Sequence, residues 1–162
     1  MSVYFDTSVF LAIFNGEPTV RSIRGLLREL KSDKIRVYTS VITVQEVSVL
    51  SFRAGQASTD NHSKVEQLAR IYTVDKDIAL TAAKLEAQML DQTPVKNQTD
   101  NRRRKWDCFH IATAMVLGCR ELYSIDERML NRKIQLGIRG VEFLLPSPKK
   151  LELFDRESGL VQ

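Results

Sequence analysis

The chain has few residues of the types that build disulfide frameworks and zinc sites. It holds two cysteines and two histidines in 162 residues, and its cysteines, Cys108 and Cys119, form no C-x-x-C pair. This argues against a disulfide scaffold and a zinc site. No apolar run approaches the roughly 20 residues that span a bilayer, and the first residues lack the pattern of a signal peptide. We therefore expect a cytoplasmic protein without a membrane segment.

What the chain does have is the composition of a globular domain. Its 43% hydrophobic and 27% charged residues, over 162 positions, are enough to bury a core without metal or disulfides. Lysine and arginine number 24 against 20 aspartates and glutamates, a formal net charge of +4. Such an excess is compatible with a polyanionic partner but is common in proteins without one. We expect one domain over residues 1–146 and a C-terminal tail over residues 147–162.

Short apolar, β-branched runs alternate along the chain with segments of helical periodicity. The predicted strands cover residues 2–6, 35–39, 71–74, 122–125 and 141–145, with helices between them. Residues 91–105 lack apolar periodicity and are predicted to form an exposed loop. Strands that alternate with helices favour a parallel sheet covered on both faces. The sequence therefore predicts an α/β fold, a three-layer α/β/α sandwich with a central parallel sheet.

Two of the predicted strands lead to an aspartate: Asp6 is the last residue of the first strand, and Asp126 directly follows the fourth. In an open parallel sheet, the carboxyl ends of the strands form the crevice where ligands bind. Both aspartates are therefore candidates for a ligand site. The alternative for each is a structural role as the N-cap of the helix that follows, which aspartate often fills.

Two further acids fall on predicted helices beside apolar residues. Glu46 has Ile42, Val49 and Leu50 one turn away, so it lies next to the buried stripe of its helix. The alternative is a boundary glutamate that reaches solvent or pairs with an arginine. Asp107 opens its predicted helix, where the helix dipole alone would favour a carboxylate.

The four acids share one property: an α/β sheet brings all of their positions toward one end. Carboxylates gathered within a few ångströms repel and raise each other's pKa unless a cation holds them together. Oxygen ligands without cysteine and with little histidine favour Mg²⁺ or Mn²⁺. We therefore predict a divalent-metal site formed by Asp6, Glu46, Asp107 and Asp126. His110, one turn beyond Asp107, is predicted to be a packed, hydrogen-bonded residue, with binding of a substrate phosphate as the alternative.

The segments that carry these acids resemble the four motifs of the PIN domain family, a nuclease fold seen in VapC-like toxins of prokaryotic toxin-antitoxin pairs. They are, in chain order, VYFDTS at residues 3–8, TSVITVQE at 39–46, WDCFHIATA at 106–114 and YSIDER at 123–128. Each motif is short, but the four follow the family's order and spacing over residues 2–145. Ser124 stands where threonine is more usual.

The resemblance implies an endoribonuclease that uses Mg²⁺ or Mn²⁺ to hydrolyse RNA phosphodiester bonds. The four acids would be its catalytic metal ligands, and Ser8 and Ser124 would support them. An antitoxin partner and a homodimer are also implied. The alternative is a PIN-fold protein outside toxin pairs that binds RNA or protein without cleavage. A phosphotransfer receiver-like domain also gathers acids at strand ends, but it needs an acidic pair where this chain has Thr7 and Ser8.

A basic run directly precedes Asp107. It consists of Arg102, Arg103, Arg104 and Lys105. Because the chain tethers this run near the acidic site, its charges could neutralise phosphates that flank a scissile bond. The alternative is solvated surface, the usual role of such runs. Trp106 could stack on a base of a single strand, or it could pack at the start of the helix.

Overall fold

The computed structural model describes residues 1–53, 55, 59–92 and 97–149. Within these ranges it shows, in chain order, β1 (Ser2–Phe5), α1 (Thr7–Asn15), α2 (Val20–Ser32), β2 (Arg36–Ser40), α3 (Val41–Arg53), α4 (Thr59–Leu68), β3 (Arg70–Tyr72), α5 (Lys76–Gln92), α6 (Gln98–Val116), β4 (Glu121–Tyr123), α7 (Glu127–Leu136) and β5 (Glu142–Leu144). None of these helices combines the length and the apolar character that crossing a lipid bilayer demands.

The strands form one parallel sheet in the order β3-β2-β1-β4-β5. The predicted central parallel sheet is therefore confirmed. The chain builds outward from β1 to β3 and then crosses to the other side of β1 to add β4 and β5. This reversal places a topological switch point between β1 and β4, the position where open α/β sheets bind ligands. Asp6 follows β1 directly, and Asp126 lies three residues after the end of β4.

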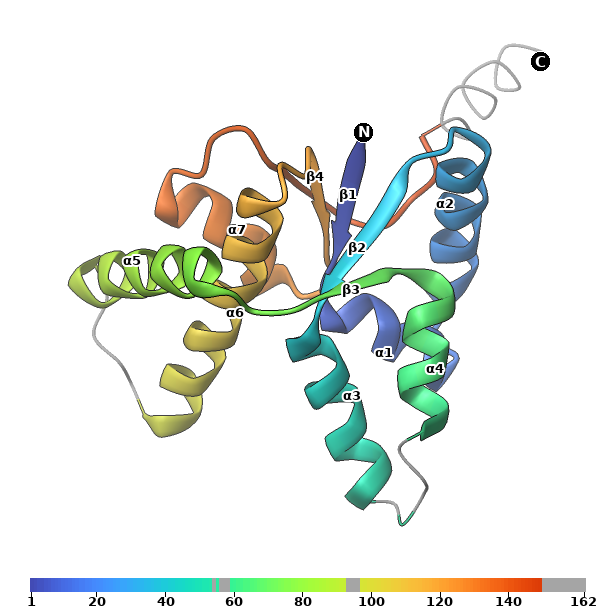
Figure 1. Ribbon diagram of the computed structural model, residues 1–162, viewed down its shortest axis with the longest axis horizontal. Coiled ribbons are helices and arrows are strands. Elements are labelled where there is room, and N and C mark those ends of the chain that lie inside the picture. The colour runs from blue at the N-terminus through green and yellow to red at the C-terminus, as the bar shows by residue number, and fades with distance from the viewer. Residues whose placement is uncertain (54, 56–58, 93–96, 150–162) are drawn as a thin grey trace, which may run out of the picture.

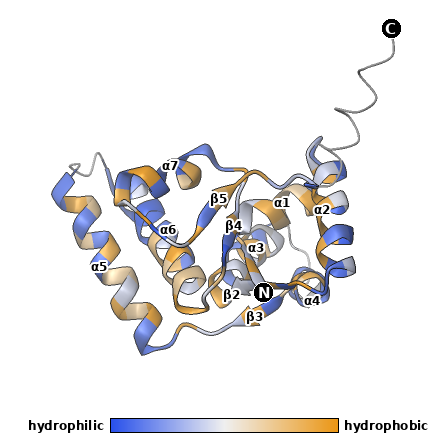
Figure 2. Cartoon of the chain, turned by 90° about the horizontal axis from the view of Figure 1, so that it is seen from above, coloured by the Kyte–Doolittle hydropathy of each residue, from blue (hydrophilic) through white to orange (hydrophobic). Residues whose placement is uncertain are grey.

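Helices cover both faces of the sheet and complete the three layers (Figure 1). The side chains of β1 alternate between two cores, as the pleat requires. Val3 and Phe5 pack with α1 to α4, whereas Tyr4 packs on the other face with Ile78 of α5 and Ile111 of α6. Figure 2 shows α1 as mostly hydrophobic, while α2 and α5 alternate between hydrophobic and hydrophilic residues. The apolar stripes of these helices therefore cover a central strand that is buried on both faces.

The structure corrects the predicted loop over residues 91–105. Residues 91 and 92 belong to α5, and residues 98–105 form the first two turns of α6; residues 93–96 lie outside the described part. Asn97 caps α6 by accepting a hydrogen bond of 2.9 Å from the backbone N–H of Asp100. Asp100 in turn pairs with Arg104, four residues along, at 2.7 Å. These turns are almost entirely polar, so capping and ion pairing stabilise them without any apolar periodicity.

The segment after β5 packs against α2. Pro148 lies so close to Gly25 that a Cβ atom at position 25 would stand 2.7 Å from Pro148 Cγ, and Lys149 forms an ion pair with Glu121. The first residues of the predicted tail thus contact the body of the domain. Residues 150–162 lie outside the described part, and the boundary at residue 146 stays a prediction.

Candidate active site

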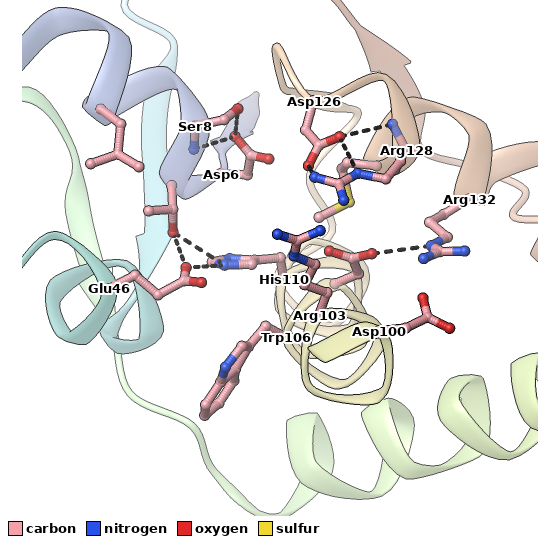
Figure 3. A pocket seen from close by; sticks show the side chains of 14 residues that line it. Asp6, Ser8, Glu46, Asp100, Arg103, Trp106, His110, Asp126, Arg128 and Arg132 are labelled. Carbon is pink, nitrogen blue, oxygen red and sulfur yellow. Dashed lines mark hydrogen bonds and ion pairs between the residues drawn. The ribbon is translucent and has the colours of Figure 1, made fainter. Parts of the chain in front are cut away.

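All four predicted acids line one pocket at the carboxyl end of the sheet. The pocket has a volume of about 330 Å³, and its lining also includes Thr7, Ser8, Arg103, Trp106, His110, Arg128 and Arg132. Asp6, Glu46, Asp107 and Asp126 come from four different segments, as Figure 3 shows for the three that it labels. The convergence expected from the topology is therefore present.

Asp6 is the most firmly held of the acids. It is the N-cap of α1, so the capping role considered from the sequence is confirmed. Its Oδ1 accepts hydrogen bonds from the backbone N–H and the hydroxyl of Ser8, at 3.0 and 2.6 Å, and its Oδ2 accepts one from the Ser124 hydroxyl at 2.7 Å. Burial raises the pKa of Asp6 against the attraction of His110 and these hydrogen bonds. Capping of α1 accounts for the hydrogen bonds that Oδ1 accepts, whereas the hydrogen bond from Ser124 links Oδ2 to the segment after β4.

Ser8 and Ser124 also join the ends of β1 and β4 to each other. The Ser8 hydroxyl oxygen accepts a hydrogen bond of 2.9 Å from the backbone N–H of Ile125 and lies 3.3 Å from the Ser124 hydroxyl. Ser124 accepts one of 3.0 Å from the backbone N–H of Asp126. The two hydroxyls predicted to support the site therefore contact Asp6 directly and fix the segment that carries Asp126.

Glu46 projects into the pocket from α3 and pairs with a histidine, not with the arginine considered from the sequence. Its Oε2 accepts hydrogen bonds from His110 Nε2 at 3.1 Å and from the Thr7 hydroxyl. Burial alone would raise the pKa of Glu46, but the hydrogen bond and charge of His110 and the hydrogen bond from Thr7 hold it below its ordinary value. Glu46 is therefore a partly buried carboxylate held in its charged form.

Asp107 lies in the middle of α6, so a helix-dipole explanation for its position is wrong. Its Oδ2 accepts a hydrogen bond of 3.1 Å from Nε of Arg132 on α7. Burial raises the pKa of Asp107 to about 6 although Arg132 attracts the charged form, and nearby Asp126 adds to the rise. A partly buried acid with a raised pKa in a cleft is typical of a functional site.

Asp126 is the N-cap of α7 and interacts with its own helix through both oxygens. Oδ1 accepts hydrogen bonds from the backbone N–H and Nε of Arg128, at 2.9 and 3.1 Å, and Oδ2 accepts one from Nη2 at 2.9 Å. Although burial raises the pKa of Asp126, these bonds and the charges of Arg128 and Arg103 hold it below its ordinary value. The predicted capping role is confirmed here too.

The donor set fits a divalent cation in kind, since carboxylate oxygens are the preferred ligands of Mg²⁺ and Mn²⁺. Within the described residues, neither Glu46 Oε1 nor Asp107 Oδ1 receives a hydrogen bond, so each acid offers one oxygen to the pocket. Over the same residues, no three acids, histidines or cysteines lie close enough together to hold an ion. Asp107 and Asp126 are each paired with an arginine of α7. Binding of a cation by three or more of the acids therefore requires some of their side chains to move closer together.

The structure separates the members of the basic run. Arg103 lines the pocket, Arg104 is buried in its ion pair with Asp100, and Arg102 and Lys105 are exposed outside the pocket lining. Trp106 is half-buried at the pocket, with its ring centroid 6.0 Å from that of Phe109. The tryptophan thus packs within its helix while it borders the site.

Residues that the sequence did not single out complete the site. Thr7 contacts Glu46, and Arg128 and Arg132 hold two of the acids. One signal was available in the sequence, because Arg128 and Arg132 are four residues apart and so share a face of the helix that follows Asp126. Nothing in the sequence indicated which acid each arginine contacts.

Comparisons with known proteins agree with this architecture. A family model described as the PIN domain matches residues 3–134, whereas no curated protein matches the chain. Among solved structures, a toxin-antitoxin complex from Klebsiella pneumoniae is 21% identical, with a TM-score of 0.59 over 89% of this chain and 97% of that chain. VapBC-1 from nontypeable Haemophilus influenzae is 16% identical, with a TM-score of 0.61 over 90% of this chain and 98% of that chain. VapC20 from Mycobacterium tuberculosis, described as a Sarcin-Ricin loop cleaving toxin, is 17% identical, with a TM-score of 0.54 over 78% and 92%. At these identities the likeness shows the fold.

Proposed function

The chain belongs to the PIN domain family, and from this premise we propose that it is an endoribonuclease that uses Mg²⁺ or Mn²⁺ and acts as the toxin of a type II toxin-antitoxin pair. The observation that carries the proposal is the meeting of four carboxylates from four segments in one pocket. Part of this cluster is costly without a cation, because burial raises the pKa values of Asp6 and Asp107 and so penalises their charged forms. Asp107, partly buried in the middle of α6, has no capping role to explain its place beside the other acids, which makes metal binding a candidate role for the group.

In this proposal, Asp6, Glu46, Asp107 and Asp126 hold the cation. A bound divalent cation would lower the pKa of a coordinated water and offset the charge that develops on the phosphate. Asp6 is fixed by Ser8 and Ser124, so its position is set before the cation arrives. Water attack on phosphorus breaks the bond to the 3′ oxygen, which leaves a 5′ phosphate and a 3′ hydroxyl.

The arginines at the pocket give the phosphates of RNA a place to bind. Arg103 lines the pocket, and its charge acts on Asp126. If Asp126 turns toward the cation, Arg128 is released at the same rim, where its planar guanidinium fits a phosphate. The proposed RNA-binding segment is the run from Arg102 to Lys105, in which Arg103 lines the pocket and Arg104 is buried against Asp100.

The proposal extends to partners and location. Two of the similar solved structures are described as toxin-antitoxin or VapBC assemblies, so we propose a protein antitoxin as the partner that restrains this chain. A homodimer is proposed by analogy with the family alone. A ribonuclease that acts on cellular RNA would work in the cytoplasm.

One observation favours a second candidate, a PIN-fold protein that binds RNA or protein without cutting it. Asp107 and Asp126 are neutralised by Arg132 and Arg128, and ion pairs of this kind can stabilise a fold that needs no metal. The two candidates differ in whether divalent cations change what the protein does to RNA.

Metal dependence tests the main proposal. The purified protein is incubated with end-labelled single-stranded RNA and with a transfer RNA, in Mg²⁺, in Mn²⁺ or in EDTA. We expect cleavage with either cation, no cleavage in EDTA and recovery when Mg²⁺ is added in excess. Glu46→Gln should abolish cleavage in every condition. RNA binding without cleavage in all conditions would favour the second candidate, and equal cleavage by wild type and variant would indicate a contaminating nuclease.

Arg103→Gln should weaken RNA binding measured in EDTA, where no cleavage interferes. The slope of log K against log salt concentration is negative, and loss of one phosphate contact reduces its magnitude by about 0.7 for a single strand. Arg102→Gln is the matched control, because Arg102 is exposed on the same helix but outside the pocket lining. Equal changes in both variants would mean that the run acts as diffuse basic surface, without a contact at the pocket.

A further inference from the structure

His110 is almost fully buried, with 3% of its surface exposed, yet it lines the acidic pocket. This confirms the packed, hydrogen-bonded residue expected from the sequence. Both of its ring nitrogens have partners. Nδ1 lies 2.7 Å from the Tyr4 hydroxyl. Nε2 lies 3.1 Å from Glu46 Oε2 (Figure 3). The ring thus bridges the central strand β1 and the helix α3 from a position on α6.

The direction of these hydrogen bonds follows from the groups involved. An ionised carboxylate only accepts, so Nε2 carries the hydrogen that it shares with Glu46. Nδ1 accepts from the hydroxyl of Tyr4 when the ring is neutral and donates to its oxygen when the ring is protonated, and Tyr4 is fully buried and cannot turn to solvent. The orientation of the imidazole is therefore set by a buried tyrosine on the central strand of the sheet.

The bonds to Glu46 are unevenly distributed between its two oxygens. Oε2 accepts hydrogen bonds from both His110 Nε2 and the Thr7 hydroxyl, whereas Oε1 accepts none from the described residues. A glutamate side chain has several rotatable bonds, so a carboxylate without such anchors would sample many positions in the pocket. Two donors on one oxygen fix the group and leave the other oxygen toward the site.

We propose that His110, oriented by Tyr4, is the positioning residue of Glu46 and presents Glu46 Oε1 to the divalent cation. The inference rests on the proposed function, because it concerns how one acid meets the cation. It assigns a role to a chain of side chains, Tyr4 to His110 to Glu46, that spans three elements. Partners that orient a metal ligand in this way contribute about 10- to 100-fold to metal affinity.

Two substitutions distinguish the roles of the two ring nitrogens of His110. His110→Gln places an amide nitrogen near the position of Nε2, so a donor to Glu46 is retained. In His110→Asn, the shorter side chain places its amide only near the position of Nδ1. The contact with Tyr4 can therefore persist, while the donor to Glu46 is lost. Both variants keep a polar group at a buried position, which makes them matched in chemistry and different in reach.

The measurement is Mn²⁺ affinity without RNA, by paramagnetic resonance of free Mn²⁺ or by calorimetry. We expect His110→Asn to weaken binding about 10- to 100-fold and His110→Gln to stay within a few-fold of wild type. In a Glu46→Gln background, His110→Asn should cause no further loss, because the acid that it positions has been replaced. Tyr4→Phe, which keeps the ring, should give a smaller loss than His110→Asn.

Several results would overturn the inference. Equal Mn²⁺ affinity of both His110 variants, whether like wild type or equally reduced, would show that the Nε2 donor does not matter. A loss that persists undiminished in the Glu46→Gln background would place the effect of His110 elsewhere. If wild type itself binds no Mn²⁺, the proposed function fails as well, which distinguishes that failure from failure of the positioning role alone.

Discussion

Asp6→Asn is expected to lower the rate of RNA cleavage by at least about a hundredfold, because the loss of a direct ligand should exceed the 10- to 100-fold effect of a supporting residue. Asparagine is as good an N-cap as aspartate, so α1 should stay intact. The amide keeps the size of the carboxylate, and its oxygen can still accept the bonds from Ser8, while its NH2 group can donate to the Ser124 hydroxyl oxygen in place of the bond that Oδ2 accepts. What it lacks is the negative charge that a divalent cation needs.

The control for this variant is Asp91→Asn, the same chemical change at an exposed residue of α5 that does not line the pocket. Cleavage of a labelled single-stranded RNA under single-turnover conditions gives the rate for each protein. Asp91→Asn should cleave at the rate of wild type. If Asp6→Asn cleaved RNA at the rate of wild type, Asp6 would not be a ligand of the catalytic cation, whatever the behaviour of the other acids.

Asp107→Asn is expected to make the metal-free protein more stable at pH 8. The pKa of Asp107 is about 6 in the folded protein against 3.8 for an unperturbed aspartate, so the folded state prefers the neutral form. Ionisation of Asp107 then lowers the free energy of unfolding as the pH rises from about 4 to 6, and the loss persists at higher pH. A shift of about two pKa units corresponds to at most about 3 kcal/mol, or several degrees in melting temperature. The amide avoids this penalty.

Thermal melts in EDTA from pH 4 to pH 8 measure this effect. The difference between Asp107→Asn and wild type should be largest above pH 6 and should narrow toward pH 4. Asp126→Asn is the matched contrast, because Arg128 holds the pKa of Asp126 below its ordinary value. Its ionised form therefore stabilises the fold, and Asp126→Asn should melt lower than wild type at pH 8. A lower melting temperature for Asp107→Asn would mean that its ion pair with Arg132 outweighs the cost of burial.

The sequence predicted the parts of the site that depend on strand ends. Asp6 and Asp126 follow apolar runs, and a parallel sheet brings the ends of such runs together whatever the side-chain details. Residues 98–105 were predicted wrongly because polar turns stabilised by a cap and an ion pair have no apolar periodicity to detect. That error also placed Asp107 at the start of a helix, although it lies in the middle of α6.

Side-chain pairing could not be predicted in the same way. Tyr4 and His110 are 106 positions apart in the chain, and Arg132 forms a hydrogen bond with Asp107, which lies 25 positions earlier. Long, flexible side chains choose partners by the positions of helices in space, which no local pattern encodes. The sequence thus gives the backbone positions of the acids but not which hydrogen bonds each of them makes.

The position of β4 beside β1 determines when the pocket forms during synthesis of the chain. The hydrogen bond between Asp6 and Ser124 joins residues 118 positions apart. A growing polypeptide on the ribosome therefore has β1 long before it has the strand that closes the crevice, and contacts of such separation form slowly. A nascent chain that ends before Ser124 therefore lacks the partner that holds Asp6 Oδ2, and its candidate site is incomplete.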